Sequence, residues 1–249
     1  MTAGAISMST MGSVLSERVL AAAARVLGER GLRLRVRDDL SGWVALLAAS
    51  GSADGVNPTF DPRCGPVDSG SGFWLAVVDD SGDTVACCAY RVLRDGPLAK
   101  LIRTGRLWFD PVPPPLRAPV PCVLPADAPD FRGTVGHIGG LWVRPDLRGV
   151  GLPGLLGQTT RAVAVGRYPI DWDTGVYRRA IAERPRLVAA YQFFRIVPCV
   201  AGFFPPTGQV EQLHLGYSPR HHLLGGLRAS AEEWAAERLD AARTRAVAR

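Results

Sequence analysis

The sequence predicts an α/β fold built on one mixed sheet. Its 249 residues are 47% hydrophobic, which is enough for the core of one large domain. Helical and extended patterns follow one another as two helices, a hairpin, a strand, a helix, a strand, a helix and further strands. This order is typical of a mixed sheet, because a parallel sheet needs a regular alternation of strand and helix.

Helical spacing of apolar residues predicts an amphipathic helix over residues 13–30. A second, shorter helix is predicted over residues 40–49, where Asp38 or Asp39 lies near the first turn and can complement its free N–H groups. Residues 50–72 are rich in Gly, Pro, Ser and Asp and therefore predict a long loop.

Two apolar runs around a polar turn predict a β-hairpin over residues 73–93. Prolines then predict an extended loop over residues 110–129, because a fixed φ and a missing N–H disfavour both helix and central strand. The remaining patterns predict a strand over 135–143, a helix over 152–165, a short strand over 168–172, a helix over 180–194, strands over 199–204 and 211–217, and a helix over 231–248. Ser230 and Glu233 form a capping box in front of this last helix.

The net charge of +6 comes almost entirely from arginines that are scattered along the chain. They form no compact basic run with interleaved aromatics, so the sequence argues against nucleic-acid binding. The five cysteines match neither a disulfide framework nor a paired zinc motif. We find no signal peptide and no apolar run long enough to span a membrane. We therefore expect a soluble, cytoplasmic protein with reduced thiols and no membrane partner.

Residues 137–156, HIGGLWVRPDLRGVGLPGLL, change from a strand-like run to arginine, proline and closely spaced glycines, and then become apolar again. Glycines at a strand-to-helix turn let successive backbone N–H groups converge on a diphosphate without side-chain obstruction. The helix that begins near Leu152 adds the positive end of its dipole at the same place. Pro153 has no N–H, so one donor is expected to be missing.

This stretch resembles the acyl-CoA-binding motif of the GNAT superfamily of N-acetyltransferases. The core signature of that family is Arg or Gln, two residues, Gly, one residue, and Gly or Ala. Here the signature is occupied by Arg148, Gly149, Val150, Gly151, Leu152 and Pro153, so the last position departs from it. The resemblance covers roughly residues 73–217. It implies a GNAT-type twisted mixed sheet, flanked by helices on both faces and splayed between two central strands.

The resemblance implies acetyl-CoA as the co-substrate, and it implies no metal. The residues that would hold the pyrophosphate are Arg148, Gly149, Val150, Gly151 and Gly154. The backbone N–H of Leu141 would polarise the acetyl carbonyl. The backbone around Val143 would pair with the pantetheine arm like an added strand.

Two other interpretations of the glycines compete with this one. Gly149, Gly151 and Gly154 also match a dinucleotide-binding fingerprint, and Asp171 follows at about the right distance for a ribose contact. That fingerprint needs its first glycine directly after a strand, whereas residues 144–148 intervene here and no regular series of βα units surrounds it. The remaining interpretation is an ordinary structural turn between a strand and a helix.

The segment AAYQFFRI, residues 189–196, resembles a second family pattern in which Ala and Tyr precede Gly-Phe, although Arg195 and Ile196 replace that pair. Tyr191 matches the tyrosine whose phenol commonly protonates the departing CoA thiolate. The alternative is a core tyrosine with a satisfied hydroxyl, because the phenylalanines beside it indicate packing.

His137 is the candidate general base, because an unperturbed imidazole titrates near neutral pH. It lies four residues before Leu141, so period-two alternation predicts both side chains on one face of the strand. The alternative for His137 is a hydrogen-bonded structural histidine. Asp171 and Asp173 could steer a cationic amine, but we expect both to face solvent.

These observations predict direct transfer of an acetyl group from acetyl-CoA to a primary amine of a small molecule or a peptide. The acetyltransferase core would span residues 73–227. Residues 1–72 would belong to the same domain, and residues 228–249 would form a C-terminal helix. A thin apolar stripe on that helix, including Trp234 and Leu239, would pack on the domain or on a second copy in a homodimer.

Two alternative functions stay open at the level of sequence. The first is a catalytically degenerate acyl-CoA-binding sensor or interaction domain, which Pro153 and the altered residues 195–196 support. The second is modification of aminoacyl-tRNA or of a protein with a basic tail. The sequence does not identify the acceptor.

Overall fold

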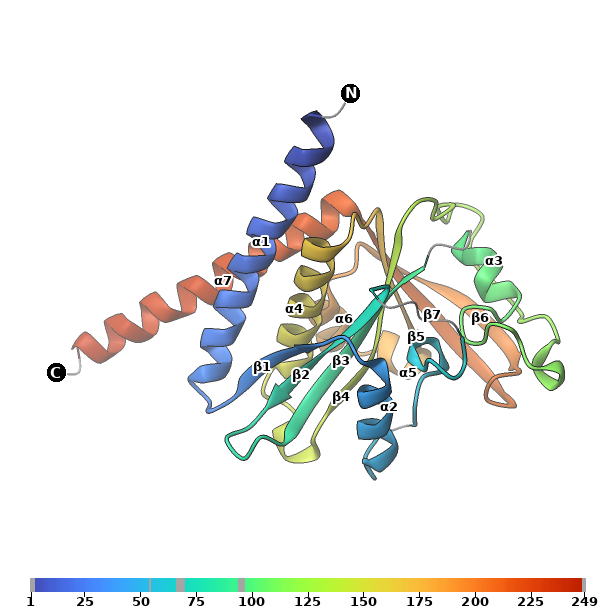
Figure 1. The fold of residues 1–249 in the computed structure, drawn as a ribbon, viewed down its shortest axis with the longest axis horizontal. Helices are drawn as coiled ribbons and strands as arrows, with labels where there is room; N and C mark the ends of the chain where they lie inside the picture. Colours follow the sequence, from blue (N-terminus) through green and yellow to red (C-terminus); the bar gives the residue numbers. More distant parts are fainter. Residues whose placement is uncertain (1–2, 54, 66–69, 94–96, 248–249) are drawn as a thin grey trace.

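The protein is described by a computed structural model over residues 3–53, 55–65, 70–93 and 97–247 (Figure 1). The described residues form one seven-stranded sheet in the order β1-β2-β3-β4-β5-β7-β6. The strands are β1 (Arg33–Arg37), β2 (Gly72–Val78), β3 (Thr84–Leu93), β4 (Val135–Val143), β5 (Trp172–Arg178), β6 (Arg195–Phe204) and β7 (Gln209–Pro219). Neighbouring strands are antiparallel except β4 and β5, which are parallel. The predicted mixed sheet is confirmed.

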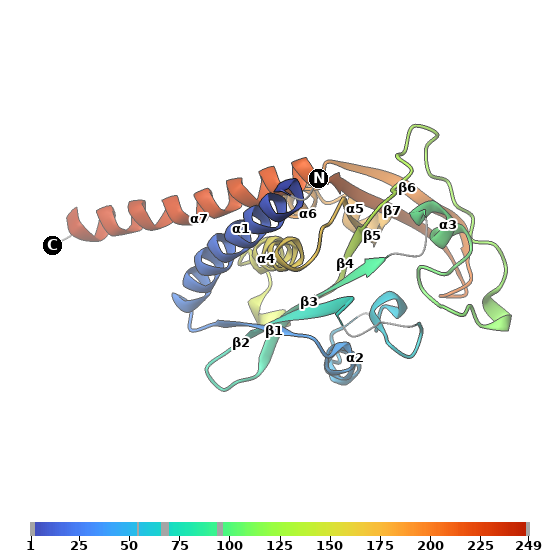
Figure 2. The same cartoon turned by 45° about the horizontal axis from the view of Figure 1, so that its top comes forward.

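Helices cover both faces of the sheet, as expected. They are α1 (Ala3–Gly28), α2 (Leu40–Ala49), α3 (Leu98–Arg103), α4 (Leu152–Arg167), α5 (Arg179–Ala182), α6 (Pro185–Tyr191) and α7 (Arg220–Val247). α1, α4 and α7 lie on one face, and α2 lies on the other (Figure 2). A further apolar core fills the end of the sheet formed by β6 and β7, where α3 packs (Figure 1).

α4 is enclosed between the sheet and α1, so every residue from 155 to 165 is buried. Two glycines let α1 and α4 approach closely. A Cβ on Gly12 would lie 2.9 Å from the carbonyl oxygen of Val165, and a Cβ on Gly166 would lie 2.8 Å from the hydroxyl of Ser16. The apolar stripe of the N-terminal helix is therefore the surface that covers α4.

Two predicted elements between α4 and β6 are wrong in position. The predicted strand over 168–172 is instead β5, which begins at the last of those residues. The apolar pattern of β5 is interrupted by Asp173, an aspartate that the sequence predicts at the surface. In the structure this side chain is buried and forms an ion pair with Arg161. The predicted helix over 180–194 is broken into α5 and α6 at Pro185, whose ring lacks the N–H of a continuous helix.

The C-terminal helix also begins earlier than predicted. α7 starts at Arg220, so the predicted capping box does not cap a helix. Ser230 lies inside α7, is buried, and accepts a hydrogen bond from the side chain of Gln192 at 3.5 Å. Two short elements, β1 and α3, have no counterpart among the predicted ones. The side chain of Leu239, which the predicted apolar stripe of this helix includes, lies outside the described part of the structure.

β4 contains a bulge at two consecutive glycines. The register against β3 shifts at this point, and Gly140 has a φ of +57°. A Cβ on Gly139 would lie 2.7 Å from the ring of Phe60, and a Cβ on Gly140 would lie 2.1 Å from the ring of Trp43. Both glycines therefore face the α2 side of the sheet, and the alternation of side chains is reversed beyond them.

This bulge overturns the predicted neighbourhood of His137 and Leu141. His137 stacks on Phe60 on the α2 side, with the ring centroids 5.8 Å apart. Leu141 packs against the core beneath α4 on the opposite face. The extra residue in β4 is the physical reason, because one inserted residue moves every later side chain to the other face.

We expect Gly140→Ala to lower the free energy of unfolding by about 2–4 kcal/mol, because it combines a left-handed backbone with a clash against Trp43. Urea unfolding would measure the change. Gly82→Ala is the matched control, since Gly82 has a φ of +89° and no neighbouring atom within 4 Å. It should lose only about 1–2 kcal/mol from the backbone. Equal losses in the two variants would contradict the clash.

Candidate functional site

β4 and β5 separate soon after they pair. The register joins them at Val135, Gly136 and His137, whereas β4 continues to Val143. Within the described sheet, Gly140 and Leu141 pair with no residue of β3 or β5. The expected splay between two central strands is therefore present. Beyond the bulge, the edge of β4 that faces β5 is open to an added strand or an extended ligand.

The chain between β4 and α4 forms a tight turn. Residues Pro145–Leu147 make one turn of 3-10 helix, and Gly149 and Gly151 have φ values of +86° and +85°. The N–H groups of Gly149, Val150, Gly151, Leu152 and Gly154 have no hydrogen-bond acceptor among the described residues. They gather at the N-terminus of α4, where the helix dipole favours an anion.

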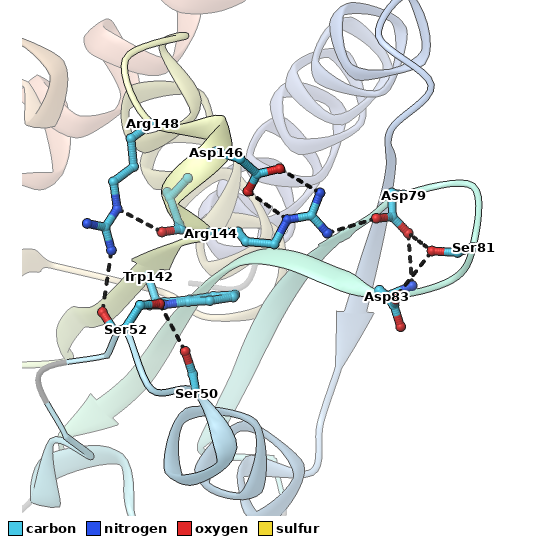
Figure 3. A network of polar contacts seen from close by, with 10 residues as sticks. Ser50, Ser52, Asp79, Ser81, Asp83, Trp142, Arg144, Asp146 and Arg148 are labelled. Atoms are coloured by element: carbon cyan, nitrogen blue, oxygen red, sulfur yellow. Dashed lines mark hydrogen bonds and ion pairs between the residues drawn. The ribbon is translucent and has the colours of Figure 1, made fainter.

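Arg144 anchors the start of this turn to the hairpin of β2 and β3 (Figure 3). Its guanidinium binds Asp146 within the turn and Asp79 after β2, with N–O distances of 2.8 and 3.0 Å. Ser81 donates a hydrogen bond to Asp79 at 2.6 Å and so orders the same hairpin loop. The turn is thus held in place by groups outside it, and its own N–H groups stay available.

The side chain of Arg148, which the sequence predicts to bind pyrophosphate, forms hydrogen bonds to the protein backbone instead. Its Nε donates to the carbonyl oxygen of Val143 at 3.1 Å, and its Nη2 donates to the carbonyl oxygen of Ser52 at 3.4 Å (Figure 3). In this arrangement the guanidinium joins the end of β4 to the loop after α2. A contact between Arg148 and pyrophosphate stays a prediction.

A cleft of about 400 Å³ opens beside the turn and lies between α1, α4, α6 and α7. Val150, Gly151 and Gly154 line it. Gly154 lets α6 approach, because a Cβ there would lie 3.3 Å from the Cβ of Ala190. Gln158 also lines the cleft; it is 3% exposed, and its side-chain nitrogen has no partner in the described part of the chain. The cleft therefore combines free donors with the size of a small-molecule site.

Tyr191 is the last residue of α6, and it contacts β5 beyond the residues of β5 that pair with β4. Its ring stacks on Tyr177 of β5, with the centroids 5.6 Å apart and the planes 10° from parallel. Burial, reinforced by the neighbouring Cys88 thiol, raises the pKa of the Tyr191 phenol to about 12. The phenol is therefore protonated at any physiological pH and can act as a proton donor.

A buried ion pair between Arg161 and Asp173 is hydrogen-bonded to the backbone of Tyr191. Arg161 of α4 donates from Nε to Asp173 at 2.6 Å and from Nη1 to the backbone carbonyl of Tyr191 at 2.7 Å. Tyr90 also donates to Asp173, at 2.9 Å. The expectation that Asp173 faces solvent is wrong, because it is fully buried; Asp171 is exposed. Arg161 is not among the predicted site residues, although an arginine directly before the apolar run of residues 162–165 indicates a buried side chain that needs a charge partner.

His137 is held as a neutral ring. Its Nδ1 lies 2.9 Å from the hydroxyl of Thr174, which donates its own proton to the carbonyl of Gly136 at 2.7 Å. Thr174 must therefore accept the proton of Nδ1, and Nε2 keeps its lone pair. Burial, with Arg91 nearby, lowers the pKa of His137 to about 3. A ring that is 1% exposed with this pKa fits a structural histidine better than a general base.

We expect His137 to make stability fall as the pH falls. Its pKa is lower in the folded than in the unfolded chain, so its contribution is complete above about pH 6.5 and is lost progressively as the pH falls towards 3. Between pH 7 and pH 5, wild type should lose about 2 kcal/mol more unfolding free energy than His137→Gln. Urea unfolding at both pH values measures this difference. Parallel losses in the two proteins would contradict the lowered pKa.

The described residues contain no group of three or more side chains arranged to hold a metal ion. Burial raises the pKa of the Cys87 and Cys88 thiols to about 12, so neither is a ready nucleophile. No helix in the described part of the chain is long and apolar enough to cross a membrane.

No protein-family model matches the sequence, and no curated protein matches it. Solved structures match about three quarters of the chain. NAA60 of Arabidopsis thaliana in complex with acetyl-CoA is 16% identical, with a TM-score of 0.47, and the match covers 76% of this chain and 99% of that chain. A SpeG spermidine N-acetyltransferase chimera from Vibrio cholerae and hSSAT is 10% identical, with a TM-score of 0.47, over 78% of this chain and 98% of that chain. AAC(6')-Ib in complex with paromomycin and acetyl-CoA is 13% identical, with a TM-score of 0.41, over 77% and 95%.

Proposed function

We propose that the protein is an N-acetyltransferase that moves an acetyl group from acetyl-CoA directly to a primary amine. The observation that carries the proposal is the row of unpaired N–H groups over residues 149–154, which lies beside the opened pair of β4 and β5. An anion-binding turn next to an open strand edge suits a ligand with a diphosphate and a long, amide-containing arm. A dinucleotide does not need the open strand edge.

The turn and the cleft fit the pyrophosphate end of this ligand. The donors of Gly149, Val150, Gly151 and Gly154 are free, and the dipole of α4 adds to them. Pro153 interrupts the row by one donor, and the buried side-chain N–H groups of Gln158 supply donors one turn further along α4. The backbone of Val143 would hold the arm, although Arg148 already binds one carbonyl there.

When bound, acetyl-CoA supplies an activated acetyl thioester. In our proposal Leu141 donates its backbone N–H to the acetyl oxygen, because the bulge frees this residue from both neighbouring strands. Tyr191 donates its phenolic proton to the departing sulfur, and its raised pKa keeps that proton in place. The amine would react in its neutral form, because the buried and weakly basic His137 is a poor acceptor for a proton. The proton that the nitrogen loses as the amide forms would return to the Tyr191 phenolate, directly or through solvent, and so restore the proton donor.

The test combines binding with turnover. Calorimetry would measure acetyl-CoA affinity, and a thiol reagent would measure CoA release with a panel of polyamines, aminoglycosides and lysine peptides. We expect saturable binding and amine-dependent release with at least one class. Binding without release on any amine would overturn the enzymatic proposal and favour an acyl-CoA-binding sensor. Absence of binding would overturn both.

A further inference from the structure

The cleft beside the turn has two walls that the sheet and α4 do not supply. α1 and α7 cross on the face of the sheet that α4 covers (Figures 1 and 2). α1 and the turn after it contribute Val26 and Arg30 to the cleft, and α7 contributes Ser230, Glu233 and Trp234. The lining residues of these helices are far apart in the sequence, so the fold brings two distant segments to one site.

Specific contacts hold both walls against the turn. Arg30 donates from Nη1 to the carbonyl of Val150 at 2.8 Å, so α1 is joined directly to the row of free N–H groups. Arg25 donates to the backbone carbonyl of Trp234 and so joins α1 to α7. These contacts hold the backbone of α7 at Trp234 close to the turn, and the half-buried side chain of Trp234 lines the cleft there.

The chemistry of the walls matches a nucleotide. Trp234 offers an aromatic surface for stacking, and such stacking contributes roughly 1–3 kcal/mol per base. Arg30 and Arg186 offer two guanidinium groups, and Arg186 has no ion-pair partner among the described residues. One carboxylate, Glu233, opposes them. The side-chain nitrogen of Gln158 is buried without a hydrogen-bond partner among the described residues, which indicates that the same cleft binds a polar ligand.

We propose that α1 with the turn after it, α7 and Arg186 of α6 form the binding site for the adenosine 3′-phosphate end of acetyl-CoA, in which Trp234 stacks on adenine and Arg30 and Arg186 bind phosphate. This inference rests on the proposed function for its ligand. It assigns affinity for the carrier to residues 26–30, Arg186 and residues 230–234, outside the motif of residues 148–154. The site therefore distinguishes CoA from shorter pantetheine thioesters that lack the nucleotide.

The experiment compares two donors and one fragment by calorimetry: acetyl-CoA, S-acetyl-4′-phosphopantetheine and adenosine 3′,5′-bisphosphate. We expect Trp234→Ala to weaken acetyl-CoA and the bisphosphate by about tenfold or more. Its affinity for S-acetyl-4′-phosphopantetheine should be unchanged. Arg186→Gln should weaken the same two ligands. Arg228→Gln is the matched control, since Arg228 is an exposed arginine of α7 that does not line the cleft.

Trp234→Phe keeps an aromatic ring and guards against misfolding, and circular dichroism would check every variant. Equal losses for all three ligands, or no loss for acetyl-CoA, would overturn the nucleotide site. Transfer to an amine with unchanged acetyl-CoA affinity in Trp234→Ala would leave the proposed function standing without this site. Binding of the bisphosphate without transfer to any amine would leave the site standing without the proposed function.

Discussion

Tyr191→Phe should lower turnover by about 100-fold or more while leaving acetyl-CoA affinity unchanged. The substitution removes one hydroxyl and keeps the ring that stacks on Tyr177. General acid catalysis by a positioned group contributes about 10²–10⁴-fold, so its loss should appear in kcat rather than in binding. Steady-state kinetics with the best amine of the panel, together with calorimetry for acetyl-CoA, would measure both.

Tyr177→Phe is the matched control for this prediction. It makes the same chemical change on the neighbouring ring, whose buried hydroxyl has no partner among the described residues. Turnover should therefore change little. If Tyr177→Phe lost turnover and Tyr191→Phe kept it, the proton donor would be assigned to the wrong ring.

The pH profile of wild type offers a second measurement of Tyr191. An ordinary phenol loses its proton near pH 10, whereas burial raises the pKa of Tyr191 to about 12. Loss of the donor should therefore begin well above pH 10. A fall in kcat centred near pH 10 in wild type, absent from Tyr191→Phe, would contradict the buried environment.

Arg161→Met should lower the free energy of unfolding by about 3–5 kcal/mol, the largest loss of stability that we expect from a single substitution. The side chains of Arg161 and Asp173 are 2% and 0% exposed, so removing the cation leaves a carboxylate buried without its charge partner. Urea unfolding at pH 7 would measure the loss. Arg132→Met is the control, because its ion pair with Asp130 is exposed and should contribute only about 0–1 kcal/mol.

The pH dependence of Arg161→Met has a definite sign. Burial already raises the pKa of Asp173 in the wild type against the lowering effects of Arg161 and Tyr90, so the loss of Arg161 should raise this pKa further. The folded variant then gains a proton more readily than the unfolded chain, so its stability relative to wild type should recover as the pH falls from 7 towards 4. Adding Asp173→Asn should restore part of the stability at pH 7. Arg161 also packs over the ring of Phe193, with its guanidinium carbon 4.2 Å from the ring centroid. A loss of stability that changes neither with pH nor with Asp173→Asn would show that this packing, and not charge, dominates.

Much of the fold could be predicted from local pattern. The hairpin, the strand over 135–143 and the helix over 152–165 are present in the structure with nearly the predicted bounds. In each element the spacing of apolar residues matches the repeat of a strand or a helix. Each element also ends at glycines, prolines or polar turn residues, whose effect on the backbone is local. The glycine turn before α4 was equally visible, because its chemistry depends on consecutive backbone groups.

The candidate site was predicted less completely, because its parts come from distant segments. Period-two alternation placed His137 beside Leu141, and the bulge at Gly140 separated them. The bulge itself follows from the rings of Trp43 and Phe60, which lie far away in the sequence. No local pattern could show that those rings would occupy the space of a side chain on β4.

A mixed α/β sheet and a strand-turn-helix unit with an anion-binding turn can be inferred from the sequence alone, because both depend on the order and spacing of neighbouring residues. The folded structure was needed to show that Asp173 is buried against Arg161, that His137 is neutral and enclosed, and that α1 and α7 meet at the cleft. These properties depend on contacts between segments that fold together from distant parts of the chain, and burial then sets the charge and the chemistry of each group.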